Sequence, residues 1–260
     1  MAWNKYKRIL KHFERRVATY GTSVETYYDM NLIDLCWSVL PKKNYDCVLD
    51  LAAGQGDFFA LLFSGVPKPE TVFLDISKSM LAKGVERGII SPARAIIANP
   101  DHNLPFLDCA FDLVLCRYAW HDFRRQKRVA KEINRILKVG GVFLFVDMSL
   151  PDNVNKTILR VYRKLHTLKT TTPSYILNFG QLKNIMEQAQ LHLLDFRWYT
   201  SFVSISDWVK ENQITSEQRE RIFDFVLHNE WAQYFVRNIE RKEKDIEFKF
   251  PVLIASFEKP

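Results

Sequence analysis

The sequence predicts an α/β fold in which helices cover both faces of a mostly parallel sheet. Two runs, CVLDLA at 47–52 and TVFLDI at 71–76, are continuously apolar apart from an acidic residue near the end of each. Continuous apolar runs of this length are typical of strands that are buried on both faces, as in parallel sheets. Segments with apolar residues at helical spacing separate the runs. Alternating strands and helices produce right-handed crossovers between neighbouring parallel strands.

The first half of the chain supports this reading element by element. Residues 4–20 carry an apolar helical stripe, and a second helix is expected over 23–40, ending before Pro41. After the strand at 47–52 the expected elements are a helix at 57–64, a strand at 71–76, a helix at 78–87, strands at 94–98 and 111–117, a helix at 124–138 and a strand at 142–148.

The second half changes character after residue 150. The expected elements are helices at 152–170 and 180–190, a strand at 192–202, two or three helices up to about residue 235, with Ser206 and Ser216 as N-caps, and a last strand at 248–259. Because no proline- or glycine-rich linker interrupts the chain, we expect one domain over 1–260. It divides into an N-terminal helical lid (1–44), a core (45–150) and a cap with the final strands (151–260).

Composition narrows the class of protein. The chain has 260 residues, of which 47% are hydrophobic, so it can bury a substantial core. No apolar run approaches the roughly 20 residues that span a bilayer, and the N-terminus lacks the apolar segment of a signal peptide. The four cysteines show no CxxC pairing, which argues against a disulfide framework or a metal site. The sequence therefore predicts a cytoplasmic protein without a membrane span, and it leaves the oligomeric state open.

The formal net charge of +7 raises the question of nucleic-acid binding. The basic residues are dispersed along the chain, and those at 124–131 fall on one expected helix. A solvated helix face explains that arrangement, so no specific nucleic-acid partner is expected.

A glycine loop follows the first expected strand. Gly54 and Gly56 allow a tight turn and close approach to a ligand, and Asp50 stands where the strand ends. A dinucleotide fold would have a third glycine at the position of Phe59. Asp57 would place a negative charge at the start of the helix, which opposes a phosphate and suits a cationic amino-acid ligand. The alternative is a strand-to-helix turn that binds nothing.

Asp75 closes the second expected strand, about 20 residues after the loop. An acid at this place can accept hydrogen bonds from both ribose hydroxyls of a nucleoside. Enzymes that bind NAD share the feature, so Asp75 alone does not distinguish the cofactor. The alternative is an N-cap for the next helix.

Four motifs in order carry a more specific resemblance: DLAAGQG, LDISKSML, NLPFLDCAFD and RILKVGG, between about residues 45 and 150. This run resembles the type 11 group of class I methyltransferases, which use S-adenosylmethionine (SAM) and include the ubiquinone/menaquinone-biosynthesis C-methyltransferases. The resemblance implies a Rossmann-like sheet, mostly parallel with an antiparallel last strand, plus a helical cap. It also implies SAM as cofactor and S-adenosylhomocysteine as product.

The resemblance assigns the SAM-binding residues. Asp50 would anchor the amino group of SAM, and the loop residues Ala52, Gly54, Gln55 and Gly56 would hold its methionine part. Asp75 would hold the ribose. The remaining implied contacts are Ile76 and Met80 beside the adenine, Asn99, Pro100 and Asp101 along its edge, Cys116 and Arg117 under the sulfonium, and Tyr20 as the covering residue of the lid.

Two departures from the family pattern affect this site. Pro100 stands where the group has an aspartate that accepts a hydrogen bond from the adenine amino group, and Asn99 or Asp101 would have to replace it. Ala52 stands at the first glycine of the loop.

His121, in the segment YAWHDF after the fourth expected strand, is the candidate catalytic residue. An imidazole at the rim of the methyl pocket can act as a general base or orient the acceptor. The alternative is a histidine that only packs there. We therefore expect a methyltransferase acting on a small molecule, quinone-like or otherwise aromatic or apolar. The alternatives are an RNA or protein methyltransferase, and a SAM-binding protein without methyl transfer.

Overall fold

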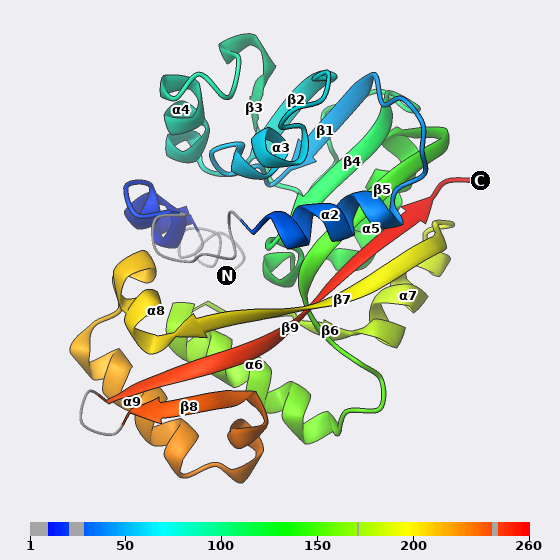
Figure 1. The fold of residues 1–260 in the computed structure, drawn as a ribbon. Helices are drawn as coiled ribbons and strands as arrows, with labels where there is room; N and C mark the ends of the chain where they lie inside the picture. The colour runs from blue at the N-terminus through cyan, green and yellow to red at the C-terminus, as the bar shows by residue number, and fades with distance from the viewer. Residues whose placement is uncertain (1–9, 21–28, 171, 241–243) are drawn as a thin grey trace.

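The computed structural model describes residues 10–20, 29–170, 172–240 and 244–260, and its strands form one open, mostly parallel sheet (Figure 1). The strands are β1 (Cys47–Leu51), β2 (Glu70–Asp75), β3 (Ala95–Ile97), β4 (Phe111–Arg117), β5 (Leu137–Leu150), β6 (Leu177–Asn178), β7 (His192–Ser204), β8 (Val236–Glu240) and β9 (Asp245–Glu258). Their main order is β3-β2-β1-β4-β5-β9-β7, in which β1 to β5 are parallel and β9 is antiparallel to β5 and β7. The predicted fold class is confirmed.

The helices cover both faces of the sheet and build the cap. They are residues 10–16, α2 (Met30–Val39), α3 (Asp57–Leu62), α4 (Lys78–Glu86), α5 (Gln126–Ile136), α6 (Lys156–Thr170), α7 (Phe179–Gln188), α8 (Ile205–Asn212) and α9 (Ser216–Leu227), with short 3-10 helices η2 (Pro92–Arg94), η3 (Trp120–Asp122) and η4 (Glu230–Phe235). The first parts of the helices predicted over 4–20 and 23–40 lie outside the described residues.

The predicted N-caps of the cap helices were wrong. Ser204 caps α8 and Thr215 caps α9, each in a reciprocal capping box with the residue three positions later. Ser206 instead donates its backbone N–H to Asp245. The sequence contained the better choice, because Thr215 is followed three residues later by a glutamine and Ser216 is not. The strand β8 was also not predicted.

Long strands β7 and β9 join the cap to the sheet. They pair in antiparallel register from His192 opposite Glu258 to Ser204 opposite Glu247. The C-terminal half of β9 packs in the core of the sheet, while Phe248 and Phe250 pack in the separate apolar cluster of the cap. The helical segment 10–16, dark blue in Figure 1, lies between the helices that cover the sheet and those of the cap.

Candidate active site

The carboxyl ends of β1, β2 and β4 meet at one edge of the sheet because these strands are parallel neighbours. A cavity of about 640 Å³ opens at this edge. Its lining residues are Phe13, Tyr20, Ala52, Gly54, Asp75, Ile76, Met80, Asn99, Pro100, Asp101, Arg117, Tyr118, Ala119, Asp122 and Phe123. Most of the residues predicted from sequence to hold SAM therefore come together around one space, which we call the sheet-edge cavity.

The glycine loop forms the floor of this cavity. Gly54 has a φ of +57°, and a Cβ added there would stand 3.5 Å from Cε1 of Tyr20, so the tyrosine ring lies directly over the loop. Ala52 also has a positive φ of 59°, a conformation that costs an L-residue roughly 1–2 kcal/mol and explains why glycine suits this position in related loops.

Asp75 ties the loop to the second strand and faces the cavity. One carboxylate oxygen accepts the backbone N–H of Gly54 and the other accepts that of Ser77, each at 2.8 Å. Burial raises the pKa of Asp75, although these amide donors oppose the shift. Ser77, and not Asp75, is the N-cap of α4. Each carboxylate oxygen can accept a second hydrogen bond, so the group remains able to bind ribose hydroxyls.

Asp50 lies beneath Tyr20 in an adjoining hollow of about 260 Å³. Its side chain is buried, and Oδ2 has no hydrogen-bond partner among the described residues. Burial raises the pKa of Asp50 to about 7, and the nearby Arg117 partly offsets this effect. An ammonium group would satisfy the orphaned oxygen and favour the charged carboxylate, so the site fits the amino group of SAM.

The segment at 99–101 is held rigidly against the cavity. The side-chain oxygen of Asn99 accepts the N–H of Asp101 at 2.9 Å, and the Asp101 carboxylate accepts the N–H groups of Arg124 and Arg125. Both side chains line the space together with Pro100. Two braced, oxygen-bearing side chains therefore flank the position at which the family has its aspartate.

Three predicted cofactor residues line neither the sheet-edge cavity nor the adjoining hollow. The amide of Gln55 donates to Val17 O, and its oxygen accepts from Arg87. Gly56 faces Ile89, since a Cβ added there would lie 2.8 Å from Cγ2 of that residue. Cys116 is fully buried in the core. The side-chain positions of these residues point away from the ligand space. Their contacts therefore stabilise the loop and the sheet.

Asp57, at the start of α3, has a basic partner that was not predicted. Its Oδ1 lies 2.7 Å from Nη2 of Arg87, so an ion pair balances the negative charge at the start of α3. The expected opposition of Asp57 to a phosphate stays a prediction, and Arg87 is the basic group that accompanies this charge.

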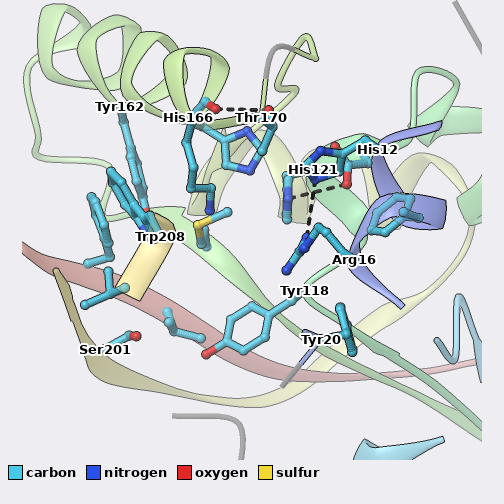
Figure 2. Close-up of a pocket in the computed structure, with 17 residues that line it drawn as sticks. His12, Arg16, Tyr20, Tyr118, His121, Tyr162, His166, Thr170, Ser201 and Trp208 are labelled. Carbon is cyan, nitrogen blue, oxygen red and sulfur yellow. Dashed lines mark hydrogen bonds and ion pairs between the residues drawn. The ribbon is translucent and has the colours of Figure 1, made fainter. Parts of the chain in front are cut away.

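A second cavity, of about 850 Å³, adjoins the first under the cap (Figure 2). Its lining residues are His12, Phe13, Arg16, Tyr20, Tyr118, His121, Asp122, Met148, Tyr162, His166, Lys169, Thr170, Ser201, Val203, Trp208, Phe250 and Val252. We call this space the cap cavity. Phe13, Tyr20, Tyr118 and Asp122 line both cavities, so the two spaces share a wall.

His121 lies in the wall of the cap cavity, paired with a buried carboxylate. Its Nδ1 lies 2.7 Å from Oδ1 of Asp147, and its backbone N–H donates to Oδ2 of the same residue. Nε2 lies 3.6 Å from Oδ2 of Asp122. Burial lowers the pKa of His121, but the two carboxylates outweigh it and raise the pKa above the ordinary value. This pairing leaves Nε2 as the ring nitrogen available to a ligand.

Two further histidines lie near His121. The ring of His166 meets that of His121 edge-on with centroids 4.5 Å apart. Burial, together with the neighbouring His121, lowers the pKa of His166 well below its ordinary value. Burial and Arg16 likewise lower the pKa of His12 to about 3. The cavity therefore combines one histidine that favours its charged form with two that favour the neutral form.

The cap lining was largely missed from sequence. Tyr162 and His166 stand four residues apart on one expected helix, the spacing that places side chains on one face. That spacing was the available signal, but it did not show which space the face would border. Trp208 both lines the cavity and stacks on Phe250.

Neither a metal site nor a membrane span occurs within the described residues. No group of three or more histidine, cysteine or acidic side chains there is placed to hold a metal ion. In the same part of the chain, every helix is too short or too polar to cross a membrane.

Comparisons with known proteins identify the family. The model of a family described as "Methyltransferase domain" matches residues 49–145. The demethylmenaquinone methyltransferase of Thermotoga maritima is 30% identical over 174 residues, which cover 66% of this chain and 71% of the relative. A Bacillus halodurans protein described as a methyltransferase superposes with a TM-score of 0.78 at 21% identity, over 89% of this chain and 100% of that one. The YcgJ protein of Bacillus subtilis gives a TM-score of 0.75 at 22% identity, over 89% and 99%.

The two structural matches show the fold, and the sequence matches show the family. SAM is accordingly the methyl donor. The chain belongs to the class I SAM-dependent methyltransferases of the type 11 group.

Proposed function

We propose that the protein methylates a small aromatic or apolar molecule, with SAM in the sheet-edge cavity and the acceptor in the cap cavity. The observation that carries this proposal is the shared wall, because Phe13, Tyr20, Tyr118 and Asp122 border both spaces. A methyl donor and an acceptor must meet across such a boundary for transfer to occur.

The sheet-edge cavity supplies groups for each part of SAM. In this proposal Asp75 binds the ribose hydroxyls, Asp50 receives the amino group, and Ile76 and Met80 flank the adenine. Asn99 and Asp101 supply the oxygen atoms nearest the expected adenine edge. Tyr20 covers the loop at Gly54, which would exclude water from the reacting end.

The bound cofactor supplies an electrophilic methyl group, so the protein mainly has to orient the acceptor and accept its proton. In this proposal His121 does the second task. Asp147 holds Nδ1 and stabilises the ring after it gains a proton, while Nε2 faces the acceptor side. The arrangement follows the same logic as other carboxylate–histidine pairs that activate a hydroxyl.

Aromatic side chains favour a flat acceptor. Tyr162, Trp208 and Phe250 form one wall of the cap cavity, with Tyr162 stacked on Phe250 at 5.0 Å and Trp208 stacked on it at 5.7 Å. The relative from Thermotoga maritima is named for demethylmenaquinone, which is a quinone. A reduced quinone-like ring is therefore the first acceptor to test.

The test is incubation of the purified protein with SAM and freshly reduced 1,4-naphthoquinone, followed by mass spectrometry for a product heavier by one methyl group. The His121→Ala variant serves as control and should form product far more slowly. If wild-type protein binds SAM but methylates neither this quinol nor a panel of phenols and apolar metabolites, the proposed acceptor class is wrong.

A further inference from the structure

Two side chains of α6 that line the cap cavity each carry a buried polar atom without a partner among the described residues. Tyr162 is 1% exposed and His166 is 5% exposed, yet Oη of the tyrosine and Nδ1 of the histidine form no hydrogen bond with any described residue. Figure 2 shows both side chains extending from the same helix toward the cavity. Buried polar atoms in folded proteins are almost always paired, so each such atom needs a reason.

Neighbouring side chains hold the rings of Tyr162 and His166 in their positions. The ring of Tyr162 lies between Phe235 at 4.7 Å and Phe250 at 5.0 Å, which fixes its direction. The ring of His166 is fixed edge-on against His121, and Thr170 donates its hydroxyl to the backbone oxygen of His166. Both side chains are therefore held in position on the side of α6 that faces the cavity.

We infer that Tyr162 and His166 are the residues that recognise the acceptor, by hydrogen bonds to two separate polar groups on one flat molecule. This inference rests on the proposed function and assigns the specificity of the same site. His166 neighbours His121, so the polar group that it binds lies beside the reacting atom, whose proton His121 accepts. Tyr162 lies one helical turn away, where side chains start about 5–6 Å apart, and binds a second group.

The protonation state of each residue determines whether it donates or accepts a hydrogen bond. Burial raises the pKa of Tyr162 well above its ordinary value, so the phenol stays protonated and donates. The lowered pKa of His166 keeps the ring neutral, and a neutral imidazole always has one nitrogen that accepts. The acceptor therefore carries a hydroxyl toward His166 and a hydrogen-bond-accepting oxygen or nitrogen toward Tyr162.

The experiment measures binding and needs no turnover. Three probes share a naphthalene ring: 4-methoxy-1-naphthol has both groups, 1-naphthol lacks the second oxygen, and 1,4-dimethoxynaphthalene lacks the hydroxyl proton. Each is titrated by calorimetry into protein saturated with S-adenosylhomocysteine. Wild-type protein should bind 4-methoxy-1-naphthol about threefold to tenfold more tightly than either of the other two, the scale of one hydrogen bond.

Conservative variants then assign each hydrogen bond. In Tyr162→Phe the advantage over 1-naphthol should disappear, while the advantage over 1,4-dimethoxynaphthalene remains. In His166→Phe the advantage over 1,4-dimethoxynaphthalene should disappear, while the advantage over 1-naphthol remains. The control is Tyr45→Phe, which removes a hydroxyl bonded to Pro41 O away from both cavities and should leave all three affinities unchanged.

Stability provides an independent readout. Tyr162→Phe removes a buried hydroxyl that has no partner among the described residues, so its thermal unfolding midpoint should equal or exceed that of wild type. A lowered midpoint would show that the hydroxyl is satisfied within the protein or by an internal water, and would overturn the assignment. Equal probe ratios in wild type and variants, or no binding of any probe, would overturn it as well. Absence of methyl transfer alongside the expected binding pattern would instead count against the proposed function alone.

Discussion

Asp147→Asn should lower the pKa of His121 and move the pH dependence of the enzyme. The Asp147 carboxylate is buried and lies 2.7 Å from Nδ1 of His121. A hydrogen bond to a charged group contributes about 1.5–3 kcal/mol, and one pKa unit corresponds to about 1.4 kcal/mol. Loss of the charge should therefore lower the pKa of His121 by about 1–2 units.

The same change should lower turnover by about a hundredfold or more. The asparagine amide can donate to Nδ1, which would place the ring proton on Nε2 and remove the lone pair that faces the acceptor. The rate of the wild-type enzyme should rise with pH through the raised pKa of His121, since only the neutral ring accepts a proton. In the variant, the remaining activity should also rise with pH, but the rise should occur at a lower pH because the pKa of His121 is lower.

Stability should follow the same linkage. Because the folded-state pKa of His121 is raised, its contribution to stability is present below the unfolded value near 6.5 and is lost as pH rises through the folded value. Asp147→Asn should thus cost more free energy of unfolding at pH 5 than at pH 9.

NMR titration of the histidine ring signals measures the pKa directly and needs no acceptor. The matched control is Asp122→Asn, whose carboxylate is 3.6 Å from Nε2, beyond hydrogen-bond distance, and which should cause a smaller shift. An unchanged His121 titration in Asp147→Asn would refute the assignment of the raised His121 pKa to the Asp147 carboxylate.

Four further outcomes are expected. Asp75→Ala should weaken SAM binding by about 1.5–3 kcal/mol in calorimetry, and an unchanged dissociation constant in a folded variant would remove the ribose role. His121→Ala should leave SAM affinity nearly intact while turnover falls about a hundredfold, and wild-type turnover would exclude it from the mechanism. Gly56→Ala should lower the free energy of unfolding by about 1–3 kcal/mol more than Gly65→Ala, because both have positive φ but only the first meets a neighbour, at 2.8 Å. Denaturation curves of equal midpoint would contradict that reasoning. RNA binding should be weak and should vanish as salt increases, whereas a nanomolar, salt-resistant complex would favour the nucleic-acid alternative.

The sheet was predictable because its strands are continuous apolar runs between amphipathic helices. The order of the loop, Asp75 and the segment at 99–101 also followed, since parallel topology brings strand ends to one edge. The sequence could not separate Gly54 from Gly56, however. Both have positive φ, but only contacts between distant segments decide that the first lies under Tyr20 and the second packs against Ile89.

The cap was harder to predict for a physical reason. Its cavity is lined by side chains from the N-terminal segment, η3 and the residue Tyr118 before it, β5, α6, α8, β7 and β9, which meet only through tertiary packing. His166 could not be recognised from the sequence, because a single histidine in a helical stripe gives no local sign of a ligand. Its nitrogen, unpartnered among the described residues and beside His121, became visible only with the whole cap assembled.

The division of the lining between two stretches of chain has an evolutionary consequence. Residues 52–123 supply most of the sheet-edge cavity, whereas residues 148–252 supply most of the cap cavity. Under the proposed roles, mutations in the second stretch alter which molecule is methylated while the methyl donor stays the same. Descendants of one ancestral gene can thus acquire new substrates by drift and selection in the cap alone. Under the same roles, a substitution at one of the four residues of the shared wall would affect the binding of donor and acceptor together.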